Sequence, residues 1–205
     1  TKPWTDRRAD NIRSLQGHNS ALYFRAMSEN SPAKQRMDLA FAALLSDDDA
    51  QALTALTRIE TQGDARAIPP LLTALAKGPS SAVQQRITSL LYQVKAKDAV
   101  PTLLASLEDE ALHPVRTTIL ATFWNAGLDV RDHLDRFIDI AIAGSAHECF
   151  ECLTVIENQE IWPEKTARLG LARVRKAATS EADAYKRSML EDLTKELEGR
   201  LGVSA

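Results

Sequence analysis

The sequence is poor in the residues on which small cross-linked folds and β-rich folds depend. Aromatic residues make up 5% of its 205 positions, and it has two cysteines, eight glycines and eight prolines. No sustained alternation of Val, Ile and Thr is present, which argues against a β-sandwich. The two cysteines are too close in sequence to make the disulfide framework of a small secreted domain, so we expect a reducing compartment, the cytoplasm. No apolar run approaches the roughly 18 residues of a membrane-spanning helix.

Leucine and alanine are abundant instead, and they recur in a repeat. Residues 68–83 and 100–115 align at an offset of 32, with a proline and apolar residues at equivalent positions: Ile68 with Val100, Pro69 with Pro101, Leu71 with Leu103, Leu72 with Leu104, Leu75 with Leu107 and Val83 with Val115. A helical repeat of this length is typical of a solenoid, in which a unit buries its apolar face only against its neighbour. We therefore predict an all-α solenoid with helical caps.

The repeat divides the chain into three parts. The prediction is an N-terminal arm or cap at residues 1–30, about four repeats at 31–160, and a C-terminal capping pair of helices at 161–205. Each repeat has a first and a second helix, placed at 67–76 and 82–94 in the second repeat and at 100–107 and 114–126 in the third. In the capping pair, Pro163 starts one helix and Ser180 caps the last one.

The third repeat carries a specific pattern. It has a proline early in its first helix, paired leucines, an aspartate at the turn and Val-Arg opening its second helix: Pro101, Leu103, Leu104, Asp109, Val115 and Arg116. This resembles a HEAT repeat, and the short period is similar to the repeats of phycobilisome lyases. The resemblance implies a right-handed α–α superhelix whose second helices line a concave face, and a scaffold role. HEAT repeats join the turn Asp and the Arg in ladders between units. Gln84 stands in place of the Arg in the second repeat, which predicts a broken ladder and an Arg116 free to bind a partner.

Charge is unevenly distributed along the chain. The net charge is −3, with residues 37–163 summing to −9 and both ends basic. An acidic centre opposes the binding of a polyanion, so nucleic acid is not an expected partner. A resemblance in outline to HEAT-like DNA glycosylases keeps it as an alternative. The acidic turns at 47–49 and 108–110 are explained as helix caps, and a ridge that recruits a basic partner is the alternative.

Two sets of side chains are candidates for contact with a partner. Tyr92 and Trp124 are 32 positions apart, near the ends of successive second helices, and with Arg116 they have the composition of an interface hot spot. The alternative is that both rings fill gaps between helices. The second set is a basic stretch near one face of a C-terminal helix: Lys165, Arg168, Arg175 and Lys176. It suits phosphate, peripheral contact with an anionic membrane surface, or a second copy of the chain, and a solvated helix face is the simpler interpretation.

Cys149 and Cys152 form a CxxC motif beside His147. With Leu153 and Ile156 they fall on one helix face, which predicts core packing rather than a zinc or redox site, because no further cluster completes four ligands. His147 and His113 occupy equivalent turns, where a cation-binding or pH-sensing role is the alternative to solvated turn residues.

No linear catalytic motif is found, and no metal or cofactor is expected. The sequence therefore predicts a non-enzymatic adaptor that binds a protein or peptide. The alternatives are a nucleic-acid-binding protein and a lyase or chaperone acting on a chromophore.

Overall fold

In a computed structural model of the chain, residues 32–62 and 64–202 are described, and all their regular elements are helices. The elements are α2 (Pro32–Leu44), α3 (Asp49–Gln62), η1 (Ala65–Ala67), α4 (Ile68–Ala76), α5 (Ser81–Tyr92), α6 (Ala99–Ser106), η2 (Glu110–Val115), α7 (Arg116–Asn125), η3 (Arg131–His133), α8 (Leu134–Ala143), α9 (Ala146–Glu157), α10 (Glu164–Ser180) and α11 (Ala184–Leu201). The prediction of an all-α protein is confirmed. The N-terminal arm predicted at 1–30 lies outside the described residues.

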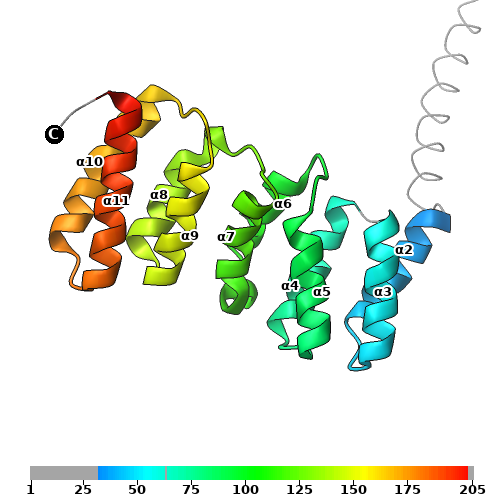
Figure 1. Cartoon of the computed structure of the whole chain (residues 1–205). Coiled ribbons are helices and arrows are strands. Elements are labelled where there is room, and N and C mark those ends of the chain that lie inside the picture. The colour runs from blue at the N-terminus through cyan, green and yellow to red at the C-terminus, as the bar shows by residue number, and fades with distance from the viewer. Residues whose placement is uncertain (1–31, 63, 203–205) are drawn as a thin grey trace, which may run out of the picture.

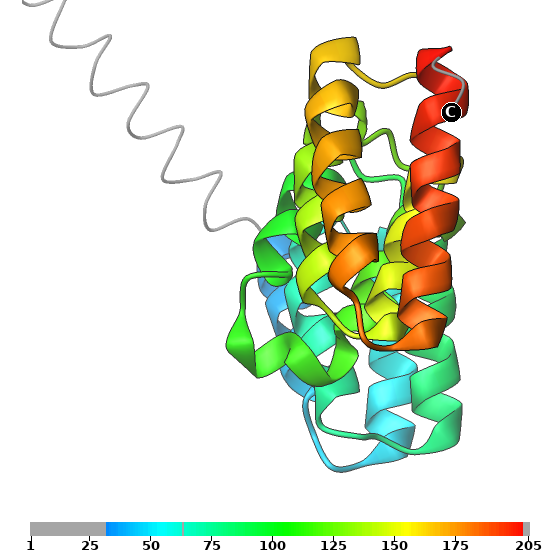
Figure 2. The ribbon, with the colours of Figure 1, turned by 90° about the vertical axis from the view of Figure 1, so that its left-hand side faces the viewer.

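Consecutive α-helices form hairpins that stand side by side in a row, from α2–α3 at one end to α10–α11 at the other (Figure 1). The second helices of the hairpins, α3, α5, α7, α9 and α11, contact one another in succession. We call them the B layer. The first helices, α2, α4, α6, α8 and α10, form the A layer behind it. The view along the row shows both layers (Figure 2). No helix of the described ranges is long and apolar enough to cross a membrane.

One continuous apolar core runs the length of the row, from Met37 in α2 to Leu197 in α11. Helix α4 illustrates how the sequence builds it. Its prolines fall in the first turn, where a missing N–H costs nothing, and Leu71, Leu72 and Leu75 recur at helical spacing and are buried. Burying one such leucine stabilises the fold by about 1.5–3 kcal/mol. Because neighbouring hairpins cover these apolar faces, each hairpin depends on its neighbours to bury its share of the core.

Polar side chains tie neighbouring hairpins together near the ends of helices. The Lys77 amine donates to the carbonyl of Leu45 at 3.1 Å, and Lys95 donates to the carbonyl of Ala126. The Gln159 amide donates to the carbonyl of Leu128 at 3.0 Å. The last carbonyls of a helix lack partners within it, so these donors satisfy groups that would otherwise depend on water. The bonds span 32, 31 and 31 residues, which matches the sequence period.

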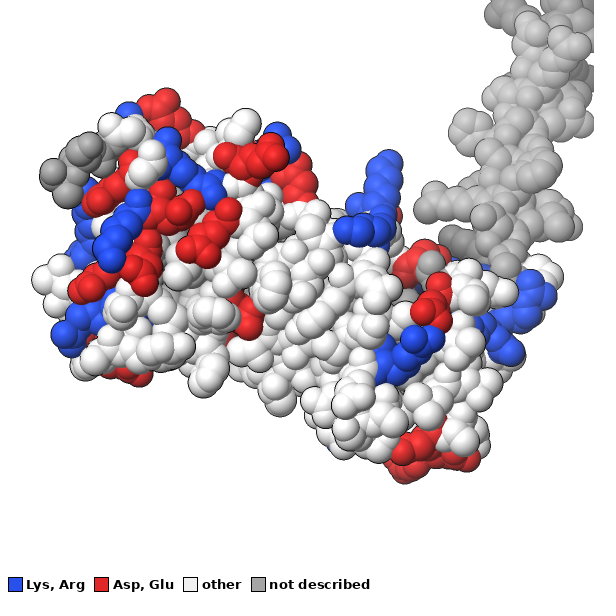
Figure 3. Space-filling model, in the orientation of Figure 1, with Lys and Arg blue, Asp and Glu red and all other residues white. Residues whose placement is uncertain are grey.

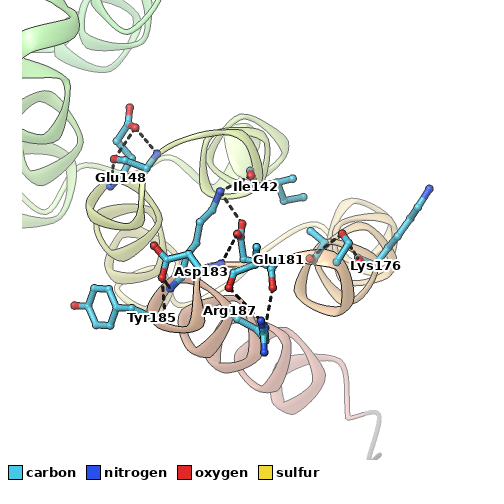
Figure 4. Close-up of polar contacts among 12 residues, drawn as sticks. Ile142, Glu148, Lys176, Glu181, Asp183, Tyr185 and Arg187 are labelled. Atoms are coloured by element: carbon cyan, nitrogen blue, oxygen red, sulfur yellow. Dashed lines mark hydrogen bonds and ion pairs between the residues drawn. The ribbon is translucent and has the colours of Figure 1, made fainter.

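The capping hairpin is fastened in a similar way by a buried lysine. The Lys186 amine donates to the carbonyl of Ile142 at 2.8 Å and lies 3.2 Å from Glu181 Oε2 (Figure 4). The side chain of Lys186 is 10% exposed, so these two partners replace the contacts with water that its amine loses on burial. Lys186 therefore links the start of α11 to the end of α8.

Two helix starts differ from the prediction. In the third repeat the second helix begins at Arg116 rather than at residue 114, because residues 110–115 form the 3-10 helix η2 with Pro114 inside it. Asp109 caps η2 by accepting from the backbone N–H of Ala111 at 2.9 Å. η2 contacts α4 and projects beside the A layer (Figure 2).

The N-cap of the last helix also differs from the prediction, which places it at Ser180. Ser180 is the final residue of α10, and Asp183 caps α11 by accepting from the backbone N–H groups of Tyr185 and Lys186 at 2.8 and 3.2 Å (Figure 4). Both residue types are good caps, and Asp183 stands directly before the first helical residue.

Candidate binding surface

The middle of the B layer presents an uncharged surface. Helices α5 and α7 contain one charged residue each, Arg86 and Arg116, in a chain of which 26% is charged. Each arginine is ion-paired with a glutamate of a neighbouring second helix: Arg86 with Glu60 of α3, and Arg116 with Glu148 of α9. The space-filling view of this side accordingly shows a broad uncharged area, with charge gathered toward both ends of the row (Figure 3).

Arg116 is ion-paired, but its buried Nε has no hydrogen-bond partner among the described residues. Its Nε lies 3.3 Å from Glu148 Oε1, and its side chain is 24% exposed. Glu148 is itself fixed, because its Oε2 accepts from the backbone N–H and hydroxyl of Ser145 at 2.7 and 2.9 Å in a capping box at the start of α9. The expectation that Arg116 is unconstrained is therefore wrong. It joins α7 to α9.

Tyr92 and Trp124 lie at the ends of adjacent second helices, as the 32-residue spacing predicts. Tyr92 is the last residue of α5 and Trp124 the next to last of α7, and both are half-buried. The indole Nε1 of Trp124 donates to Glu151 Oε2 of α9 at 2.8 Å. Burial raises the pKa of the Tyr92 phenol, and the negative charge of Glu151 raises this pKa further. Trp124 and Glu151 are thus joined directly, and Tyr92 lies at the equivalent end of the adjacent helix α5.

Sequence reasoning missed Glu151, although the helical periodicity held a signal for it. Cys149, Cys152 and Ile156 mark the buried face of α9. A residue two positions after Cys149 is turned by about 200° from it and points away from the core. The same periodicity therefore places Glu151 on the side of α9 opposite Cys149, where its carboxylate meets the Trp124 indole.

A pocket of about 350 Å³ is lined by residues of α3, α4, the end of α5 and the segment that follows α5. Its apolar lining includes Ile59, Ile68, Leu71, Leu90, Leu91 and Val94, and its polar lining consists of Glu60, Asp64, Gln93 and Lys95. Tyr92, Trp124 and Glu151 are not among its lining residues. An apolar lining with a few polar groups is typical of a site that accepts an apolar group.

The two cysteines are completely buried in α9, as predicted for core residues. Burial raises the pKa of the Cys149 thiol to about 11 and that of Cys152 well above its ordinary value. Both are therefore protonated and poorly nucleophilic at neutral pH. His113 and His147 are exposed. In the described part of the chain, no group of three or more His, Cys, Asp or Glu side chains is placed to hold a metal ion.

The predicted basic stretch of α10 is mixed in charge. Arg168 donates to Glu164 at 2.9 Å, and Arg175 donates to Glu198 of α11 at 2.6 Å. Lys165 and Lys176 are exposed. A groove of about 810 Å³ between α10 and α11 has the same mixture of signs: Arg175, Arg187, Lys195, Glu191 and Glu198. The arrangement places basic and acidic groups alternately at the end of the row (Figure 3).

The acidic turns serve the helices that follow them. Asp48 Oδ1 accepts from the backbone N–H groups of Ala50 and Gln51 at 2.9 and 3.2 Å at the start of α3. Asp109 caps η2, and Glu108 is ion-paired with Arg136 of α8. Their role as caps is the one expected of acids at helix starts.

Comparisons of the chain with protein-family models, with curated proteins and with solved structures found no match. The proposals below therefore rest on the sequence pattern and the geometry described above.

Proposed function

We propose that this protein is a non-catalytic adaptor that binds a protein or peptide along the B layer. The observation that carries the proposal is the uncharged area over α5 and α7, bordered by the half-buried rings of Tyr92 and Trp124 (Figure 3). Charged residues are depleted from the centres of protein interfaces, and Tyr and Trp are enriched there. Because 26% of the chain is charged, a surface area of this size without unpaired charge is unusual, and the packing of the core does not explain it.

We propose further that the row of hairpins is a right-handed HEAT-like superhelix whose second helices line its concave face. The sequence pattern around Pro101 and Arg116 and the inter-hairpin bonds at 31 and 32 residues support this assignment. A stack of that form presents a continuous groove along one layer, which suits an extended segment of a partner.

A nucleic acid is a poorer partner for this arrangement. Counterion release requires cations that are available to phosphates. The three arginines of α10 already have carboxylate partners: Glu164 for Arg168, Asp139 for Arg173 and Glu198 for Arg175. The uncharged area over α5 and α7 offers no cation either, since Arg86 and Arg116 are ion-paired.

The test uses peptides selected from a phage-displayed random library on the immobilised full-length protein. Affinities are then measured by fluorescence polarisation for the variant Gln85→Glu/Thr117→Glu, which places two charges on α5 and α7. The matched control, Thr73→Glu/Ala105→Glu, places two charges on α4 and α6 of the A layer, where both positions are exposed. We expect the first variant to lose binding by about tenfold or more and the control to bind as the unchanged protein does. Equal binding by both variants, or no peptide recovered, would refute the proposal.

A further inference from the structure

Glu151 of α9 lies beside the uncharged area over α5 and α7, and none of the residues 32–62 and 64–202 forms an ion pair with it. The adjacent arginine, Arg116, is paired with Glu148 one turn earlier on α9. Within residues 32–62 and 64–202, the only polar contact of the Glu151 side chain is the hydrogen bond from Trp124. Glu148 and Glu151 together thus outnumber the single arginine that faces them, and one negative charge is left over. A half-buried charge of this kind gains from a cation supplied by a ligand.

The neighbours of Glu151 are suited to a cation as well. The indole N–H of Trp124 holds one carboxylate oxygen, Oε2, and no described residue bonds to Oε1. The Tyr92 phenol stays neutral at physiological pH, because burial and the Glu151 charge both raise its pKa. Aromatic faces attract cations through their quadrupole, and partial burial strengthens the attraction. A carboxylate that is bonded to one aromatic ring, with a second ring at the end of the adjacent helix, is suited to an ammonium or guanidinium group.

We infer that Glu151, Trp124 and Tyr92 form a subsite for one lysine or arginine side chain of a bound peptide, whose flanking residues are uncharged. This inference rests on the proposed function and adds the chemistry of the partner. We expect the peptide residues on either side of the basic residue to be uncharged, because they would lie over α5 and α7, whose two arginines are ion-paired with Glu60 and Glu148. An anionic partner is disfavoured, because Glu151 would repel it without a compensating cation. A metal ion is disfavoured too, since one carboxylate alone does not supply the ligand set that a protein-bound metal requires.

The experiment uses the same selected peptides and a pair of glutamine variants. Glu151→Gln removes the charge and keeps an oxygen that can accept from the Trp124 indole. Glu157→Gln removes an exposed carboxylate from the same helix and serves as the control. Each peptide is also made with its basic residue replaced by norleucine. All affinities are measured by fluorescence polarisation at fixed salt concentration.

We expect the selected peptides to share one basic residue at a fixed position. Its replacement by norleucine should weaken binding to the unchanged protein and to Glu157→Gln by about tenfold, and should have less than a twofold effect on Glu151→Gln. Equal losses on all three proteins would overturn the inference. Peptides that lose affinity for Gln85→Glu/Thr117→Glu but share no basic residue would also overturn it, while the proposed function would stand. If the library yields no binding peptide, both this inference and the proposed function are refuted.

Discussion

Two glycines in the capping hairpin allow the packing of the row to be tested with one substitution. Gly170 and Gly199 lie inside α10 and α11, and replacing a helical glycine by alanine gains up to about 1 kcal/mol of helix propensity. A β-carbon at Gly199 meets no atom within 4 Å. A β-carbon at Gly170 would overlap Cδ1 of Ile138 on α8 and lie 3.7 Å from its Cγ1. The two positions should therefore respond with opposite signs.

The magnitudes follow from the surroundings of Ile138. This side chain is completely buried, so it has little room to change rotamer, and overpacking in a filled core costs about 1–3 kcal/mol. After the propensity gain is subtracted, we expect Gly170→Ala to lower the free energy of unfolding by up to about 2 kcal/mol. Gly199→Ala should raise it by about 0.5–1 kcal/mol. For a chain of this size each kcal/mol moves the melting temperature by about 2–4 °C.

The measurement is urea and thermal unfolding followed by circular dichroism at 222 nm. Ile138→Val supplies the control for mechanism, because it deletes the Cδ1 atom that the new β-carbon would meet. Alone it should cost about 0.5–1.5 kcal/mol. In Gly170→Ala/Ile138→Val the two losses should not add, and the double variant should be more stable than their sum by about 1 kcal/mol or more. Additive losses, or a Gly170→Ala protein as stable as Gly199→Ala, would show that α8 and α10 are not in this close contact.

Three further predictions concern other parts of the row. Lys186→Met should lower the free energy of unfolding by about 1–3 kcal/mol, because the carbonyl of Ile142 and the Glu181 carboxylate lose a buried donor, whereas Lys195→Met at an exposed position should leave the urea midpoint unchanged. Cys149 and Cys152 should not react with a thiol reagent in the folded protein at pH 7.5 and should both react in urea; modification within minutes without denaturant would contradict the burial described here. Backbone and side-chain hydrogen bonds lower the pKa of Asp48 in the folded state, so its contribution to stability is present above the unfolded pKa and is lost as pH falls through the folded pKa. Asp48→Asn keeps a capping oxygen and should flatten the acid limb of a pH–stability curve, and an unchanged curve would rule out this contribution.

The sequence was sufficient to predict elements set by local periodicity and by prolines. The 32-residue offset and Pro69 placed α4 to within a residue, and the stripe of Cys149, Cys152 and Ile156 predicted their burial in α9. Helix starts were less accurate where several residue types compete for the same role. Ser180 and Asp183 are both suitable caps, and only the course of the chain between α10 and α11 decides between them.

The candidate site was predicted only in part, because its key partners are distant in sequence. Tyr92 and Trp124 were found through their common place in the repeat. Glu148 and Glu151 were not found, because their partners on α7 lie 27 or more positions earlier: Arg116 is ion-paired with Glu148, and Trp124 donates a hydrogen bond to Glu151. Pairing across hairpins depends on the relative rotation of neighbouring helices, which a hydrophobic pattern does not determine. The same limitation led to the expectation of a free Arg116.

The net charge of a sequence segment is a poor guide to the charge of the surface that the segment forms. Residues 37–163 sum to −9, yet the area over α5 and α7 is uncharged. Acids such as Asp48 and Asp109 lie at helix starts, where they cap backbone N–H groups, and Glu60 is used by Arg86. A partner therefore meets only those charged groups that are not used in helix caps or in ion pairs. Beside the uncharged area over α5 and α7 these groups include Glu151, which is bonded to the Trp124 indole, and a ligand that fits there has to match this one negative charge rather than the net charge of the whole chain.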